Sequence, residues 1–89
     1  MSDETINDHN IREAIYSEIG KRVKLAREQV GMTQMELSKN LGLTRVSVAN
    51  IEAGRQRFAV DTLYKLAACL GIEVYELLPV PPVDLDRIR

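Results

Sequence analysis

The chain has 89 residues, of which 45% are hydrophobic and 28% are charged, a composition typical of one soluble globular domain. With one cysteine, one histidine and no long apolar run, it has no means of forming an internal disulfide, a metal site built from these ligands or a membrane span. The net charge is −1 and the acidic, polar start is unlike a signal peptide, so we expect a cytoplasmic protein without cofactors.

Glycines and prolines divide the sequence into stretches with helical periodicity. The prolines are confined to positions 79, 81 and 82, and glycines fall between apolar stretches, where a residue with positive φ ends a helix. The first helix is predicted over about residues 11–30, with Asn10 as its cap and Gly20 as a point where it could divide. Its apolar stripe consists of Ile11, Ile15, Ile19, Val23, Ala26 and Val30.

Shorter helices follow, each with a local start or stop signal. They are predicted over residues 34–41, 45–53, 60–70 and 74–78. Thr33 and Glu36 have the spacing of a capping box, Thr44 caps the next helix, and Pro79 ends the last one. Because no stretch with a period of two is long enough for a strand, we predict an all-α fold.

The segment 33–53 contains two short helices with a minimal connection. Only Gly42 and Leu43 separate them, which forces a sharp crossing, and Ser38 is small enough to let the helices approach. The side chains expected to hold this pair on the domain are Leu37, Leu41, Leu43, Val48 and Ile51. The outer face of the second helix then carries Arg45, Val46, Ser47, Ala49 and Asn50. These are short or hydrogen-bonding groups, suited to reaching base edges in a major groove.

Positive charge is concentrated in the same part of the chain. Residues 20–57 hold eight basic and three acidic residues, a net charge of +5, whereas residues 1–19 and 58–89 carry −4 and −2. Segregation of this kind is what a surface that binds a polyanion requires, although a solvated charged surface would look alike. Together with the motif, it favours a DNA-binding helix-turn-helix over a helical hairpin that binds nothing.

These residues resemble the Cro and phage-repressor (XRE) type of helix-turn-helix proteins. The similarity covers about residues 19–79 and is carried by Ile19-Gly-Lys-Arg-Val23, Gly31-Met-Thr-Gln-Met-Glu-Leu37, Val48-Ala-Asn-Ile-Glu52, Gly54-Arg55 and Glu76-Leu-Leu78. The resemblance implies a compact five-helix, lambda-repressor-like domain that binds palindromic operators as a homodimer. Outside it, we expect an acidic, partly helical leader over residues 1–18 and an extended, proline-containing tail over residues 80–89.

The resemblance also implies roles for individual residues. Those that match base-reading positions are Thr44, Arg45, Val46, Ser47 and Asn50. Those that match DNA phosphate-binding positions are Thr33, Gln34, Arg55 and Arg57, and Gln34 would also brace the third helix. Arg27 and Glu52 match an internal ion pair of the family. Two departures are Ser38, whose hydroxyl would bond to the carbonyl of Gln34, and Ala59, a weak cap for the fourth helix.

The apolar residues near the C-terminus suggest a dimer interface. They exceed what one small core needs, and we expect the contacts to come from Val74, Tyr75, Leu78 and Val80. The sequence therefore predicts a non-enzymatic transcriptional regulator, a repressor that binds a palindromic operator in double-stranded DNA as a homodimer. The alternative is the antitoxin of a toxin–antitoxin pair, whose leader or tail would bind a partner protein.

Overall fold

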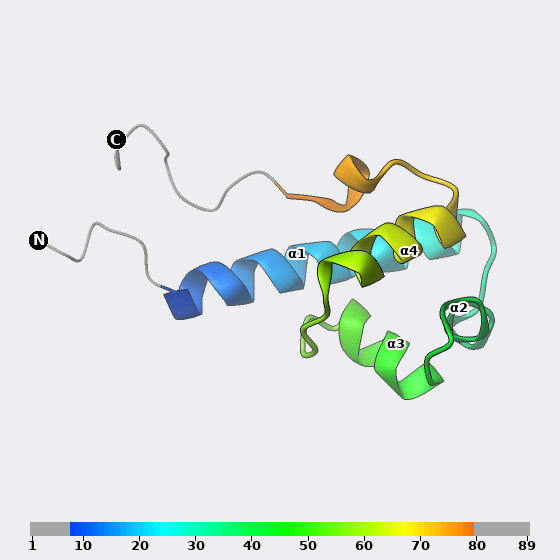
Figure 1. Cartoon of the computed structure of the whole chain (residues 1–89), viewed down its shortest axis with the longest axis horizontal. Coiled ribbons are helices and arrows are strands. Elements are labelled where there is room, and N and C mark those ends of the chain that lie inside the picture. The colour runs from blue at the N-terminus through cyan, green and yellow to red at the C-terminus, as the bar shows by residue number, and fades with distance from the viewer. Residues whose placement is uncertain (1–7, 80–89) are drawn as a thin grey trace, which may run out of the picture.

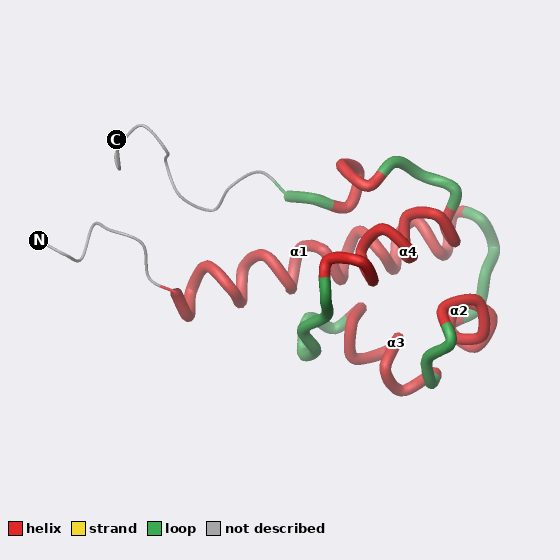
Figure 2. Tube along the Cα trace, viewed as in Figure 1, coloured by secondary structure: helices red, strands yellow, loops and turns green. Residues whose placement is uncertain are grey.

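The computed structural model describes residues 8–79, with side chains from Asn10 onward, and shows helices joined by short turns (Figures 1 and 2). The elements are α1 (Asp8–Gln29), α2 (Gln34–Leu41), α3 (Arg45–Glu52), α4 (Val60–Leu70) and the 3-10 helix η2 (Val74–Leu77). This stretch contains no strand, so the predicted all-α class is confirmed. The expected division into 1–18, 19–79 and 80–89 stays a prediction, because residues 1–7 and 80–89 lie outside the described part.

The predicted fifth α-helix is instead a short 3-10 helix. Glu73 and Glu76 form a capping box at its start, and Leu78 has extended backbone angles (φ −91°, ψ 127°). A residue before a proline avoids the helical region, so Pro79 leaves room for only four helical residues after the cap. The fold therefore has four α-helices and one 3-10 helix over the described residues.

The first helix is longer than its apolar pattern predicts and is not divided. It begins at Asp8, so Asn10 lies inside it and the predicted cap at that residue is wrong. Gly20 lies in the middle of the helix and is buried against the last turn of α3. A side-chain carbon at Gly20 would lie 2.6 Å from the carbonyl oxygen of Glu52, and closer still to that of Ile51. The glycine is therefore needed for close helix packing rather than for a break.

Local capping signals fix α2 and α3. The Thr33 hydroxyl accepts the Glu36 N–H (3.0 Å), while the Glu36 carboxylate accepts the Thr33 N–H (2.8 Å). The backbone N–H of Thr33 and then its hydroxyl hold the pKa of Glu36 below its usual range. The Thr44 hydroxyl accepts the Ser47 N–H (3.0 Å), and Gly42 ends α2 in the left-handed region (φ 71°). The predicted capping box and both caps are confirmed.

Two details around the turn between α2 and α3 differ from the predictions. The Ser38 hydroxyl donates to the carbonyl oxygen of Met35 (2.7 Å) and not to that of Gln34. In a helix, a serine hydroxyl can reach either the third or the fourth preceding carbonyl, so its acceptor is set by the side-chain rotamer. Leu43 is 36% exposed, because it follows Gly42 in the turn instead of lying on either helix, and it does not anchor the pair.

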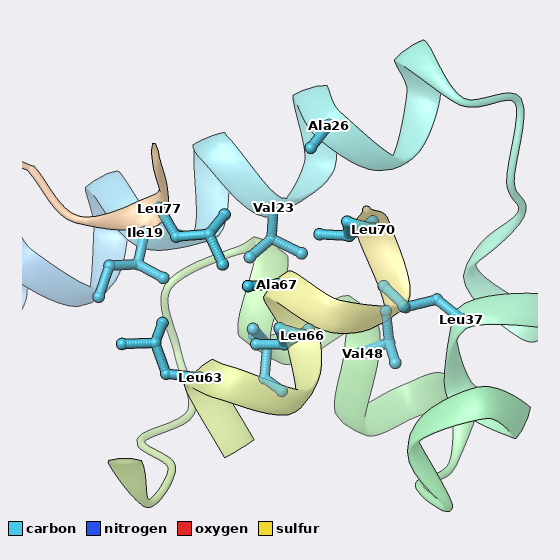
Figure 3. Close-up of a cluster of buried hydrophobic side chains, with 11 residues drawn as sticks. Ile19, Val23, Ala26, Leu37, Val48, Leu63, Leu66, Ala67, Leu70 and Leu77 are labelled. Atoms are coloured by element: carbon cyan, nitrogen blue, oxygen red, sulfur yellow. The ribbon is translucent and has the colours of Figure 1, made fainter. Parts of the chain in front are cut away.

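The core is formed between the four α-helices and η2, each of which contributes buried side chains (Figure 3). Its buried apolar residues are Ile19, Val23, Ala26, Leu37, Val48, Ile51, Leu63, Leu66, Ala67, Leu70 and Leu77. Of the predicted anchors of the helix pair, Leu37, Val48 and Ile51 are buried, and Leu41 packs against the core. Val30 is exposed because α1 has ended at Gln29. Ala59 makes no side-chain cap to α4, as predicted.

One arginine of α1 holds the last described turn in place. Arg22 Nη1 donates to the carbonyl oxygens of Leu78 (3.2 Å) and Glu76 (3.4 Å), and Arg22 Nε donates to Glu18 on the same helix (3.3 Å). Carbonyls at the end of a helix lack partners within the helix. Arg22 supplies those partners and thereby fixes η2 against α1.

Candidate nucleic-acid interface

The third helix has one face in the core and one face toward solvent. Val48, Ile51 and Glu52 are buried, and α3 lies with α2 at the edge of the molecule opposite η2 (Figure 1). On the other face Arg45 is exposed and Val46 is 58% exposed. Also on α3, Ser47, Ala49 and Asn50 are partly exposed, whereas Thr44 before it is exposed. The residues predicted to read bases therefore all remain accessible, to different degrees.

A buried ion pair fixes this helix to α1. Arg27 Nε lies 2.6 Å from Glu52 Oε2, and Arg27 Nη2 donates to Glu52 Oε1 (3.1 Å), with side-chain exposures of 10% and 3%. Arg27 Nη1 donates to the carbonyl oxygen of Met32 (2.7 Å). The hydrogen bond that Arg27 donates to the Glu52 carboxylate is the main cause that raises the pKa of Arg27. These are the two residues that the family resemblance pairs, and their bonds stabilise the charges that burial would otherwise penalise.

The ion pair is the inner end of a chain of hydrogen bonds that reaches the exposed face. Gln34, the first residue of α2, donates through Nε2 to Glu52 Oε1 (3.0 Å). Its Oε1 accepts from Arg45 Nη1 (3.1 Å), and Arg45 is the first residue of α3. The bracing role expected of Gln34 thus has a geometric basis, while the link to Arg45 was not anticipated. Its only signal in the sequence is that both residues directly follow a threonine cap.

The far end of α3 is followed by a loop that carries two exposed arginines. Arg55 donates through its backbone N–H to the Asn50 carbonyl (2.9 Å) and through Nε to Asn50 Oδ1 (3.3 Å). Gly54 precedes it with φ 77°, a conformation that favours glycine. Arg55 and Arg57 are exposed, as is Thr33 at the start of α2. Of the four residues expected to bind phosphate, two therefore stand at the start of α2 and two in the loop after α3.

The predicted dimer contacts only partly form an exposed apolar surface. Tyr75 is 68% exposed and Leu78 is exposed, but Val74 packs against the core and Val80 lies outside the described residues. A second exposed pair, Val60 (72%) and Tyr64 (60%), lies one turn apart on α4. Sequence reasoning did not single out that pair, although its spacing of four residues on a predicted helix is visible.

No three His, Cys, Asp or Glu side chains of the described residues are grouped so that they could hold a metal ion. Within residues 8–79, none of the helices combines the length and apolar character that crossing a membrane demands.

Comparison with known proteins finds relatives that regulate genes. A family model described as helix-turn-helix matches residues 23–77. A hypothetical transcription factor of Neisseria meningitidis serogroup B is 38% identical, over 70% of this chain and 58% of that protein. The immunity repressor protein of Bacillus phage phi105 is 36% identical, over 63% and 39% respectively. Antitoxin HipB of Escherichia coli K12 is 31% identical, over 67% and 70%. The chain thus spans little more than half the length of the first relative.

Solved structures with a similar fold include a controller protein and part of an enzyme. The restriction-modification controller protein C.AhdI from Aeromonas hydrophila has a TM-score of 0.66 and 32% identity, over 70% of this chain and 94% of that one. Hydroxypropylphosphonic acid epoxidase from S. wedmorenis has a TM-score of 0.72 and 29% identity, over 75% of this chain but only 36% of the enzyme. The likeness to the enzyme therefore concerns about a third of it.

Proposed function

The chain belongs to the XRE-type helix-turn-helix family of DNA-binding transcriptional regulators, and on that premise we propose that it represses transcription from a palindromic operator as a homodimer. The observation that carries this proposal is the division of α3 into an anchored face and an accessible one. One helix offers about 3–4 side chains to the bases, too few for specificity across a genome, so two half-sites are expected. The protein would act in the cytoplasm and would catalyse no reaction.

We propose that the exposed face of α3 reads the bases. Arg45 would donate two hydrogen bonds to a guanine, Asn50 would pair with an adenine, and Val46 would contact a thymine methyl group. Thr44 and Ser47 would lie close to the sugar–phosphate backbone or the base edges. Two hydrogen bonds support this assignment, one from Arg45 to Gln34 and one from Arg55 to Asn50. They restrict the side chains of Arg45 and Asn50 before DNA binds.

The phosphate contacts are proposed for the start of α2 and for the loop after α3. Thr33 and Gln34 stand at the N-terminus of α2, where backbone N–H groups and the helix dipole favour an anion. The Gln34 amide nitrogen uses one hydrogen for Glu52 and has a second one for a phosphate. Arg55 and Arg57 supply the charge in the loop after α3. These contacts would hold the protein in register and carry no sequence information.

A selection from random duplexes tests base reading. The full chain is expected to recover a two-fold symmetric site, and Arg45→Ala or Asn50→Ala should relax the preference at one position in each half-site. Each variant should lose about 1–3 kcal/mol of discrimination. The affinity of the unchanged chain should fall steeply with salt, with a slope of about −0.9 per phosphate neutralised. Recovery of the same consensus by the variants, or a flat salt response, would rule out this role for α3.

An antitoxin is the second candidate function, and the similarity to antitoxin HipB favours it. On this proposal the chain would still bind DNA but would also neutralise a partner protein through its leader or tail. Purification of the tagged full chain from its own cells separates the two functions. The antitoxin function requires a stoichiometric partner that is lost when the tail, residues 80–89, or the first part of the leader, residues 1–7, is removed. Recovery of the chain alone, as a dimer, would exclude the antitoxin function and leave repression as the proposed function.

A further inference from the structure

The first half of α1 precedes the family match, which begins at residue 23, yet it is fixed to the loop after α3. The rings of Tyr16 and Phe58 pack edge to face, with centroids 5.2 Å apart. The backbones of Ser17 and Gly54 approach so closely that a side-chain carbon at Gly54 would lie 2.8 Å from the Ser17 Cα. These contacts hold the added helical turns against the loop that carries Arg55 and Arg57.

The contact leaves an open groove with an excess of positive charge. Its lining residues are Arg12, Glu13, Tyr16, Gly54, Arg55 and Arg57. Among the described residues, three arginines and one glutamate therefore line the groove. The ion pairs formed among the described residues join Arg22 to Glu18, Arg27 to Glu52 and Lys65 to Asp61, and they leave Arg12 and Arg57 out. Guanidinium groups without carboxylate partners are well suited to bind phosphate oxygens.

The groove lies next to Asn50, near the end of the accessible face of α3. Arg55, which lines it, bonds to Asn50, so a duplex read by Asn50 would place its sugar–phosphate backbone beside this loop. Arg12 is exposed on α1 one helical turn before Tyr16, which fixes the helix at this point. The loop lies inside the matched family segment, whereas Arg12 precedes that segment. Its charge therefore reaches the loop from a part of the chain that the family model does not match.

We propose that this groove binds a backbone phosphate of duplex DNA beside the half-site, and that Arg12 adds a contact from outside the matched family segment. The inference rests on the proposed function, because it requires that α3 faces DNA. Arg12 would raise the affinity for every sequence equally, since a phosphate contact distinguishes no base. Glu13, in the same groove, would weaken binding through repulsion of the phosphate.

The test compares Arg12→Ala with Lys21→Ala in the full chain, on the selected operator and on a scrambled duplex. Lys21 is an exposed cation of the same helix that does not line the groove. Arg12→Ala should weaken binding to both duplexes by roughly fivefold per protomer at 150 mM salt and reduce the salt slope by about 0.9. Lys21→Ala should change affinity less than about twofold, a small effect typical of a charge away from the phosphates.

A second variant keeps the test independent of any effect of Arg12 on folding. Glu13→Gln should tighten binding to both duplexes, because among the described residues it removes the one carboxylate that lines the groove. Unchanged affinity and salt slope in Arg12→Ala, or weaker binding in Glu13→Gln, would overturn the inference while leaving the proposed function intact. If the unchanged chain binds neither duplex, the proposed function fails and the inference fails with it.

Discussion

Replacement of Gly20 by alanine is expected to destabilise the domain by about 3 kcal/mol, despite the better helix propensity of alanine. The added carbon would lie 2.6 Å from the carbonyl oxygen of Glu52, and both carbonyls that it meets belong to the backbone of α3. A backbone cannot rotate away as a flexible side chain can, so the two helices would have to separate. In a domain of this size the melting temperature should fall by roughly 12–24 °C, measured by circular dichroism.

Gly71→Ala is the matched control for this variant. Gly71 has φ 71°, and a side-chain carbon there would meet no atom within 4 Å. Its replacement should cost only about 1–2 kcal/mol, the penalty of an L-residue in the left-handed region. If Gly20→Ala melted at or above the temperature of the unchanged protein, the close packing of α1 on α3 would be refuted.

Loss of the buried carboxylate at Glu52 is expected to have a comparable or larger effect. Glu52→Leu would leave the Arg27 guanidinium buried without its counter-charge, and breaking such a pair typically costs about 3–5 kcal/mol. It would also remove the acceptor of the Gln34 amide and, through Gln34, loosen Arg45. Urea denaturation measures the loss of stability, and operator affinity measures the loss of Arg45 positioning.

The double variant Arg27→Met with Glu52→Leu separates the charge effect from the packing effect. Methionine and leucine have volumes similar to those of the arginine and glutamate that they replace, and they need no hydrogen-bond or ionic partner. Most of the lost stability should therefore return. The Gln34 amide would still lack its acceptor, so operator affinity should stay below that of the unchanged protein. A double variant as unstable as Glu52→Leu alone would contradict the assignment of the loss to an unpaired charge.

The bounds of α2, α3 and α4 could be read almost completely from the sequence, because their signals are local. Thr33, Thr44 and Gly42 act within one turn of their own position, and the structure places each where the pattern predicts. The extent of α1 could not be read in this way. Its course through Gly20 depends on the backbone of α3, more than thirty residues away in the sequence, and no local rule contains that contact.

The candidate site shows the same division between local and distant signals. The period of apolar residues in α3 correctly indicates which side chains face the core, and so which remain accessible. The bond between Gln34 and Arg45 depends instead on the crossing of α2 and α3. The groove beside Arg12 depends on the contact of Tyr16 with Phe58, two aromatic residues that nothing in the sequence pairs.

The separation of anchoring and accessible side chains on α3 has a consequence for how such proteins diverge. Val48 and Ile51 hold the helix from within, whereas Arg45 and Val46 are exposed and do not belong to the core. If the outer positions read bases as we propose, substitutions there would change the preferred DNA sequence one base pair at a time without unfolding the descendant protein. After gene duplication, two copies of this chain could acquire separate target genes while they retain one inherited scaffold.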